Sequence, residues 1–294
     1  MLATEPSVIA AEPDAVLSAT LSRRRLGITF WVAVAWLSIV VLGAIFANVL
    51  PLRSPSAVAP FEQLKGIGTP GHLLGTDDLG RDVLARMVFG SRVSLIVALS
   101  SVVVGAGVGL PVGMAAGYLR GRFDAVVVFV VDVILSFPAL VLLLALVTFL
   151  GQSLAIISLT LGFLAIPAYI RLARANTLAT ASRTFVQAAR AVGESTSRII
   201  FHELLPNVAA PVMAYSFVSM GLFIVIEGSL SFLGLSVEAP VPSWGGMIAS
   251  GSNYLLQDPQ LVLLPAIAML LTVLSLNLVG DGVRHLLDVR EARA

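Results

Sequence analysis

Acidic residues gather in one short stretch that could, by composition, bind a metal ion or transfer protons. This stretch contains Asp77, Asp78, Arg81 and Asp82. Outside a membrane, such a group is more often the solvated face of a helix, and Thr76 followed by Asp77 is typical of a helix start. We therefore predict no catalytic role for these four residues.

Metal and nucleotide chemistry also lack the residues they need. The three histidines, His72, His202 and His285, are far apart and form no spaced ligand motif, and the chain has no cysteine. A P-loop needs a lysine directly before Ser or Thr, but the only lysine, Lys65, precedes Gly66. The sequence predicts a chain that is not an enzyme and holds no metal, cofactor or ATP site of its own.

Three carboxylates lie in or beside long apolar runs, where an unpaired charge costs several kcal/mol. They are Asp132, Glu227 and Asp281. One interpretation is a polar pathway or gate for a zwitterionic cargo, with Glu227 near the outer face of its span. The other is structural: Asp132 could pair with a loop arginine, and Asp281 with Arg284. Both interpretations remain open.

Composition places the chain in a bilayer. It has 294 residues, of which 57% are hydrophobic and 12% charged, with a mean hydropathy of +0.97. That leaves too little polar surface to coat a water-soluble globule. The net charge of +1 offers no argument for nucleic acid.

Uncharged or nearly uncharged runs predict an all-α membrane protein with six transmembrane helices. Residues 1–27 should be a tail, and the first run is longer than a signal peptide's apolar region, which favours a retained anchor. Residues 51–92 are broken by prolines and glycines and should lie outside the membrane. The expected core covers residues 93–283, and residues 284–294 should form a second tail. The expected spans are 28–50, 94–119, 125–150, 153–170, 207–235 and 260–280.

The arginines predict which way the chain faces. Thirteen of the 18 Lys and Arg residues lie on the side of the termini in a six-span arrangement. Since positive charge is retained in the cytoplasm, we expect both termini and the 171–206 loop to be cytoplasmic.

That loop contains a patterned polar segment, Phe185–Asn207. Phe185, Ala188, Ala189 and Val192 recur at helical spacing and predict one apolar stripe, with Gln187 and Arg190 on the other side. Gly193 should end this helix. Ser195 or Thr196 should cap a second short helix, and Pro206 suits the first turn of the next span.

The segment resembles the "EAA" loop of ABC importer membrane subunits. The motif residues are Gln187, Ala188, Ala189, Gly193, Leu205 and Pro206; Gln187 replaces the usual Glu, and Glu203 the usual Ile. Three further blocks occur in matching order: HLLGTDDLGRDVLARMVFGSRVSL from His72, DVILSFPALVLLLAL from Asp132, and EGSLSFLGLSVEAPVPSWG from Glu227. Together the four blocks closely resemble the C-type membrane subunit of dipeptide/oligopeptide ABC importers.

This resemblance implies a type I (MetI-like) permease fold in the inner membrane of a prokaryote. It implies half of a channel, completed by a second homologous permease subunit. One or two ABC ATPase subunits would carry ATP and Mg and receive the coupling loop, and an extracytoplasmic peptide-binding protein would dock on a collar shaped by residues 76–82.

Several alternatives stay open. The same family includes importers of nickel and of glutathione. An autonomous secondary transporter would need coupling groups at mid-membrane, where only Asp132 and Glu227 are available. A structural membrane anchor is the third class.

Overall fold

The apolar runs form long helices in the computed structural model, which describes residues 27–291. Helices are expected because a backbone crossing lipid must satisfy its own hydrogen bonds. Five are long and apolar enough to span a membrane, and a bent pair makes a sixth crossing. The long helices are α2 (Ile28–Phe46), α3 (Val83–Leu119), α6 (Leu154–Ala181), α9 (Leu205–Phe232) and α11 (Gln260–Glu291). The prediction of an all-α protein with six crossings is confirmed.

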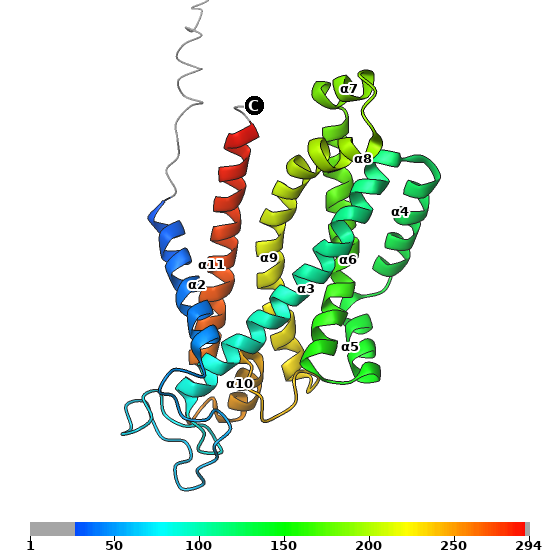
Figure 1. The fold of residues 1–294 in the computed structure, drawn as a ribbon. Helices are drawn as coiled ribbons and strands as arrows, with labels where there is room; N and C mark the ends of the chain where they lie inside the picture. The colour runs from blue at the N-terminus through cyan, green and yellow to red at the C-terminus, as the bar shows by residue number, and fades with distance from the viewer. Residues whose placement is uncertain (1–26, 292–294) are drawn as a thin grey trace, which may run out of the picture.

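Short elements mark the two ends of the bundle (Figure 1). At one end, called the α7 end, lie α7 (Thr184–Ala191), α8 (Thr196–Arg198) and both limits of the described chain. At the other lie α10 (Trp244–Gly251), the 3-10 turn Ser252–Tyr254 and the collar segment, defined as residues 51–82. The collar segment is mostly irregular, with isolated bridges between Thr69 and His72 and between Thr76 and Asp82.

The third crossing differs from the single span predicted over 125–150. It consists of α4 (Gly121–Leu135) and α5 (Ala139–Leu150), which are bent by 80° relative to one another. Pro138 lies at the break, where its own backbone is non-helical with ψ of 118°. Its ring disfavours the helical conformation at Phe137, and it has no N–H to donate.

Several helices extend beyond the apolar runs that predicted them. α3 begins at Val83 rather than Ser94, and α6 continues past Ile170 to Ala181. α11 runs to Glu291, so residues from 284 to 291 continue a helix instead of forming a separate tail. Loss of hydrophobicity marks the edge of a hydrocarbon layer, whereas a helix ends only where capping or a turn ends it. The predicted N-terminal tail lies outside the described residues, apart from Gly27.

The closest helix packing joins α3 to α6 along a line of glycines, which we call the glycine seam. A Cβ at Gly109 would lie 2.4 Å from Tyr169 Cβ, and one at Gly113 would lie 2.5 Å from the Ile170 carbonyl oxygen. Small residues permit such backbone approach in lipid. The four seam residues are Gly105, Gly109, Gly113 and Gly117.

The remaining long helices attach to this pair. The Tyr169 hydroxyl donates to Ser216 of α9 at 3.2 Å, and α9 packs along α11. α2 packs against α11, where the Trp36 indole donates to Thr272 at 3.0 Å. In Figure 1, α2 and α11 lie at one edge of the bundle and the bent α4–α5 pair at the other.

The seam predicts different costs for two neighbouring substitutions on α3. Gly109→Ala should destabilise the protein by about 1–3 kcal/mol, because the added methyl group forces packed helices apart. Gly107→Ala is the matched control, since no heavy atom lies within 4 Å of its Cβ position. Thermal unfolding in mild detergent measures the difference. Equal melting temperatures for the two variants would show that the seam is not a tight contact.

Candidate functional site

The motif-bearing helix α7 is held against the bundle chiefly by a residue outside the predicted apolar stripe. Val186 is fully buried, and Ala189 packs against the main core. The predicted apolar stripe is instead largely exposed: Phe185 is 39% and Val192 79% exposed, and Ala188 is also exposed. A stripe that looks like a buried face therefore points away from this chain.

Arg190 was predicted to lie on the opposite side of α7 from the apolar stripe, and it lies on the side that faces the bundle. It lies one turn after Val186, and its guanidinium carbon is 4.6 Å from the centre of the Tyr118 ring at the end of α3. Gln187 is exposed, and its side-chain amide donates to the Ser182 carbonyl at 3.1 Å. The amide thus fastens α7 to the turn before it.

Gly193 ends α7 as predicted, in a left-handed conformation with φ of +81°. The Gly193 amide donates to the Arg190 carbonyl at 3.0 Å, and the Glu194 amide to the Ala189 carbonyl at 3.1 Å. These two bonds make a Schellman cap, a geometry in which glycine avoids a Cβ clash. The bend after α7 is therefore set by the backbone conformation of one residue.

The second half of the loop is continuous with the next span rather than a separate short helix. The Ser195 hydroxyl accepts from the Arg198 amide, so the predicted cap is confirmed. From there α8, the π-helix Ile199–Leu204 and α9 form one helical run, Thr196–Phe232. Leu205 is half-buried, while Pro206 is exposed in the first turn of α9, where its missing N–H is tolerated.

At the opposite end, the acidic cluster is buried rather than solvated. Asp77 accepts from the Arg81 guanidinium at 2.7 Å and lies 3.3 Å from that of Arg86. The helix starts later than predicted, because Asp82, not Thr76 or Asp77, caps α3 by accepting from the Ala85 amide at 2.7 Å. Thr76 is fully buried and bridges the Glu62 carbonyl and the Lys65 amide.

His72 belongs to the same network and was not predicted to. Its two ring nitrogens lie 2.9 Å from Asp82 and 3.0 Å from Glu62. No local pattern could indicate this contact, because the three residues are ten positions apart and come together only when the segment folds. Gly80 allows that folding, since a Cβ there would lie 1.9 Å from the Ala59 carbonyl oxygen. The collar segment is thus a defined structure built from buried polar contacts.

Glu227 is completely buried and accepts hydrogen bonds from three serines. Ser236, in the connection after α9, donates at 2.6 Å, and Ser94 of α3 and Ser231 of α9 each donate at 3.4 Å. The carboxyl group therefore joins α3, α9 and the α9–α10 connection. Its role as a pathway or gate residue stays a prediction.

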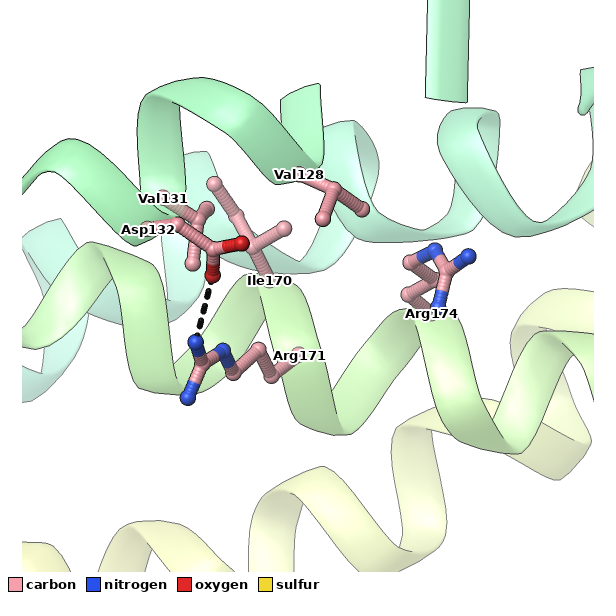
Figure 2. A pocket seen from close by; sticks show the side chains of 6 residues that line it. All are labelled: Val128, Val131, Asp132, Ile170, Arg171 and Arg174. Atoms are coloured by element: carbon pink, nitrogen blue, oxygen red, sulfur yellow. Dashed lines mark hydrogen bonds and ion pairs between the residues drawn. The ribbon is translucent and has the colours of Figure 1, made fainter. Parts of the chain in front are cut away.

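Asp132 pairs with an arginine, as the structural interpretation expected. Its carboxylate accepts from Arg171 at 2.6 Å, with both side chains more than half exposed. Figure 2 shows the pair pointing toward one another at a cavity of about 250 Å³ between α4 and α6. The cavity is lined by Val128, Val131, Asp132, Ile170, Arg171 and Arg174.

A second, stronger pair closes the gap between the same two helices. Asp124 in the first turn of α4 accepts two hydrogen bonds from Arg174, from Nε and, at 2.7 Å, from a terminal nitrogen. Both side chains are partly buried. Sequence reasoning missed this pair because Asp124 and Arg174 lie 50 positions apart. Asp281 is exposed on α11, and its pairing with Arg284 stays a prediction.

The helix arrangement is that of the type I (MetI-like) ABC importer permease fold. An inward-facing structure of the methionine ABC transporter MetNI matches with a TM-score of 0.57, covering 69% of this chain and 97% of that one. Sequence identity there is 20%, so the likeness concerns the fold alone.

The family follows from the sequence matches. Residues 109–293 match the binding-protein-dependent transport system inner membrane component family, and the chain belongs to it. It is 38% identical to the di/tripeptide transport system permease protein DppC of Pseudomonas aeruginosa over 256 residues, which are 85% of this chain and 84% of that one. It is 35% identical to the glutathione transport system permease protein GsiD of Pectobacterium atrosepticum over 228 residues, 78% and 76% of the two chains. The resemblance to peptide-type ABC importer permeases and the inner-membrane location are confirmed.

The two ion pairs between α4 and α6 should differ in strength. Arg174→Gln should cost about 1.5–3 kcal/mol, because it leaves the partly buried Asp124 without its charged donor. Arg171→Gln is the matched control and should cost at most about 1 kcal/mol, since exposed pairs contribute little. Thermal unfolding in detergent compares them. A swap, Asp124→Arg with Arg174→Asp, should recover part of the loss, and a swap no better than Arg174→Gln alone would contradict the pairing.

Proposed function

We propose that this chain is the permease subunit through which an ATP-driven importer takes up di- and oligopeptides. It would form half of the channel with a second homologous permease subunit. ATP and Mg would bind one or two separate ATPase subunits, because the chain has no P-loop lysine of its own.

The observation that carries this proposal is the outward-facing apolar stripe of α7. Phe185, Ala188 and Val192 are exposed on a helix whose opposite face is anchored by Val186. An apolar stripe on a short helix that is anchored to the bundle is suited to insertion into a groove of a partner protein. The fold of the family and the motif residues Gln187, Ala188, Ala189, Gly193, Leu205 and Pro206 support an ATPase subunit as that partner.

The structure of the two ends fits this direction of transport. The α7 end carries most of the arginines and would face the cytoplasm. The collar segment, with Thr76, Asp77, Arg81 and Asp82 fixed by buried contacts, would then present a preformed surface to an extracytoplasmic peptide-binding protein.

The names of the relatives bear on the cargo. DppC relatives are named for dipeptide and di/tripeptide transport, and GsiD relatives for glutathione transport. Glutathione is itself a small peptide, so a peptide cargo is common to both names. Glutathione is therefore the second candidate cargo of the same machine. An autonomous secondary transporter fits less well, because Asp132 is paired to Arg171 at the helix surface and Glu227 is enclosed by serines.

Reconstitution tests the function directly. We expect liposomes that contain this chain, its partner permease and the ATPase subunits to accumulate a labelled dipeptide only when ATP and the binding protein are present. Excess unlabelled tripeptide should compete at least as well as glutathione. ATP-independent uptake by this chain alone would contradict the proposal, and stronger competition by glutathione would move the cargo to the second candidate.

Gly193 offers a sharp test of the coupling loop. Gly193→Val should lower uptake and binding-protein-stimulated ATPase activity, because a β-branched residue in the left-handed region costs about 1–2 kcal/mol and disturbs the bend. Gly193→Asn is the control, since asparagine tolerates that conformation. No heavy atom lies within 4 Å of the Cβ position, so side-chain size alone should not matter. Both variants should insert normally, and coupled transport at the parent rate in Gly193→Val would contradict the assigned role.

A further inference from the structure

One contact joins the coupling helix to a helix that is remote from it in sequence. The Arg190 guanidinium lies over the Tyr118 ring, 4.6 Å from its centre. Arg190 occupies an unspecified position of the loop motif, between Ala189 and Gly193, so the motif alone gives it no role. It shares the inner face of α7 with the buried Val186. The cation–π geometry is therefore part of how α7 is seated on the bundle.

The helix on the other side of this contact reaches the far end of the molecule. α3 is continuous over 37 residues, which corresponds to about 55 Å. Tyr118 lies in its last turn, and Asp82 caps its first turn. Because Asp82 also contacts His72, the start of α3 is built into the collar segment. Figure 1 shows α3 running diagonally from the collar segment to the α7 end.

The glycine seam packs α3 so tightly against α6 that the two helices are expected to move together. At Gly109 and Gly113 the backbones interlock so closely that one helix cannot slide along the other without a clash. α7 is connected to the end of α6 only through Ser182 and Arg183, a link short enough to act as a pivot. A contact between α7 and α3 restricts rotation of α7 about that link.

We propose that Arg190 and Tyr118 are positioning residues that lock α7 to the α3–α6 pair, so that a displacement of α7 is passed to the collar segment. The proposal rests on the function proposed above, in which an ATPase subunit moves α7. Without the lock, α7 would keep the buried Val186 but could tilt relative to α3, and part of the displacement would be lost at the α7 end. An exposed cation–π contact shifts an equilibrium by about two- to fivefold. It is strong enough to bias coupling and too weak to hold the fold.

The first experiment uses the complete transporter with its ATPase subunits and binding protein. Tyr118→Leu keeps apolar bulk and removes the ring face, whereas the matched control Tyr118→Phe keeps the ring and removes the hydroxyl. We expect Tyr118→Leu and Arg190→Gln each to lower binding-protein-stimulated ATPase activity and uptake about two- to fivefold, and Tyr118→Phe to behave as the parent. The double variant should be no worse than either single variant, because both remove the same contact.

The second experiment reads the collar segment itself. The chain has no cysteine, so Leu73→Cys places one reactive thiol on an exposed position of that segment. In the parent and in Tyr118→Phe, ATP should change the rate at which this thiol reacts with a maleimide. In Tyr118→Leu the change should be reduced or absent. In complexes that retain their ATPase subunits, a contact that contributes only to stability would leave this response unchanged.

The possible outcomes distinguish failure of this proposal from failure of the proposed function on which it rests. If the ATPase subunits no longer co-purify with Tyr118→Leu, the contact only anchors α7, and the proposal is overturned. It is also overturned if Tyr118→Leu and Arg190→Gln show full stimulation and an unchanged thiol response while Gly193→Val remains defective, which leaves the coupling loop in place. If Gly193→Val also couples normally, both the coupling role of the loop and this proposal are contradicted.

Discussion

Lipid gives two apolar helices no hydrophobic reason to associate, so α3 and α6 must be held together by close packing of their backbones. The glycine seam provides this, because each of its residues lies where any side chain would collide with α6. Both functional regions depend on the resulting pair. α3 begins in the collar segment, and α6 leads directly into α7. The relative placement of the two ends of the molecule is therefore fixed by one crossing. The bent α4–α5 pair is attached to it by buried apolar side chains and by ion pairs to α6.

The two ends are stabilised by different physics. The collar segment is mostly irregular and gains its definition from buried charge pairs and hydrogen bonds, such as Asp77 with Arg81 and His72 with Asp82. Each buried charge there has an opposite charge or a backbone donor as a partner, which offsets the free-energy cost of removing the charge from water. The α7 end relies on caps and one aromatic contact, and leaves apolar side chains exposed. The collar segment thus presents a preformed surface, and the α7 end presents exposed apolar side chains that a partner could cover. This arrangement suits partners on both sides of the membrane.

Local chemistry was predictable from the sequence, and long-range contacts were not. Gly193 and Ser195 were placed correctly because a helix cap depends on a few neighbouring residues. The apolar stripe through Phe185 was identified, but periodicity cannot tell whether such a stripe faces its own bundle or a partner. Asp77 was predicted to be solvated, because the arginines that bury it are brought in by folding of the collar segment. The break at Pro138 was concealed by the apolar runs on both sides of it, which together satisfied the length criterion for one span.

The contact between the first and last spans has a consequence for biosynthesis. Trp36 of α2 donates to Thr272 of α11, 236 positions later in the chain. At a translation rate of about 5–20 residues per second, the first span waits roughly 12–47 s before its partner helix emerges from the ribosome. During that interval the side of α2 that later packs on α11, including the Trp36 indole, can contact only lipid, α3 or the insertion machinery. The bundle can thus be completed only after α11 has been synthesised. A chain truncated before α11 would leave α2 without this packing partner.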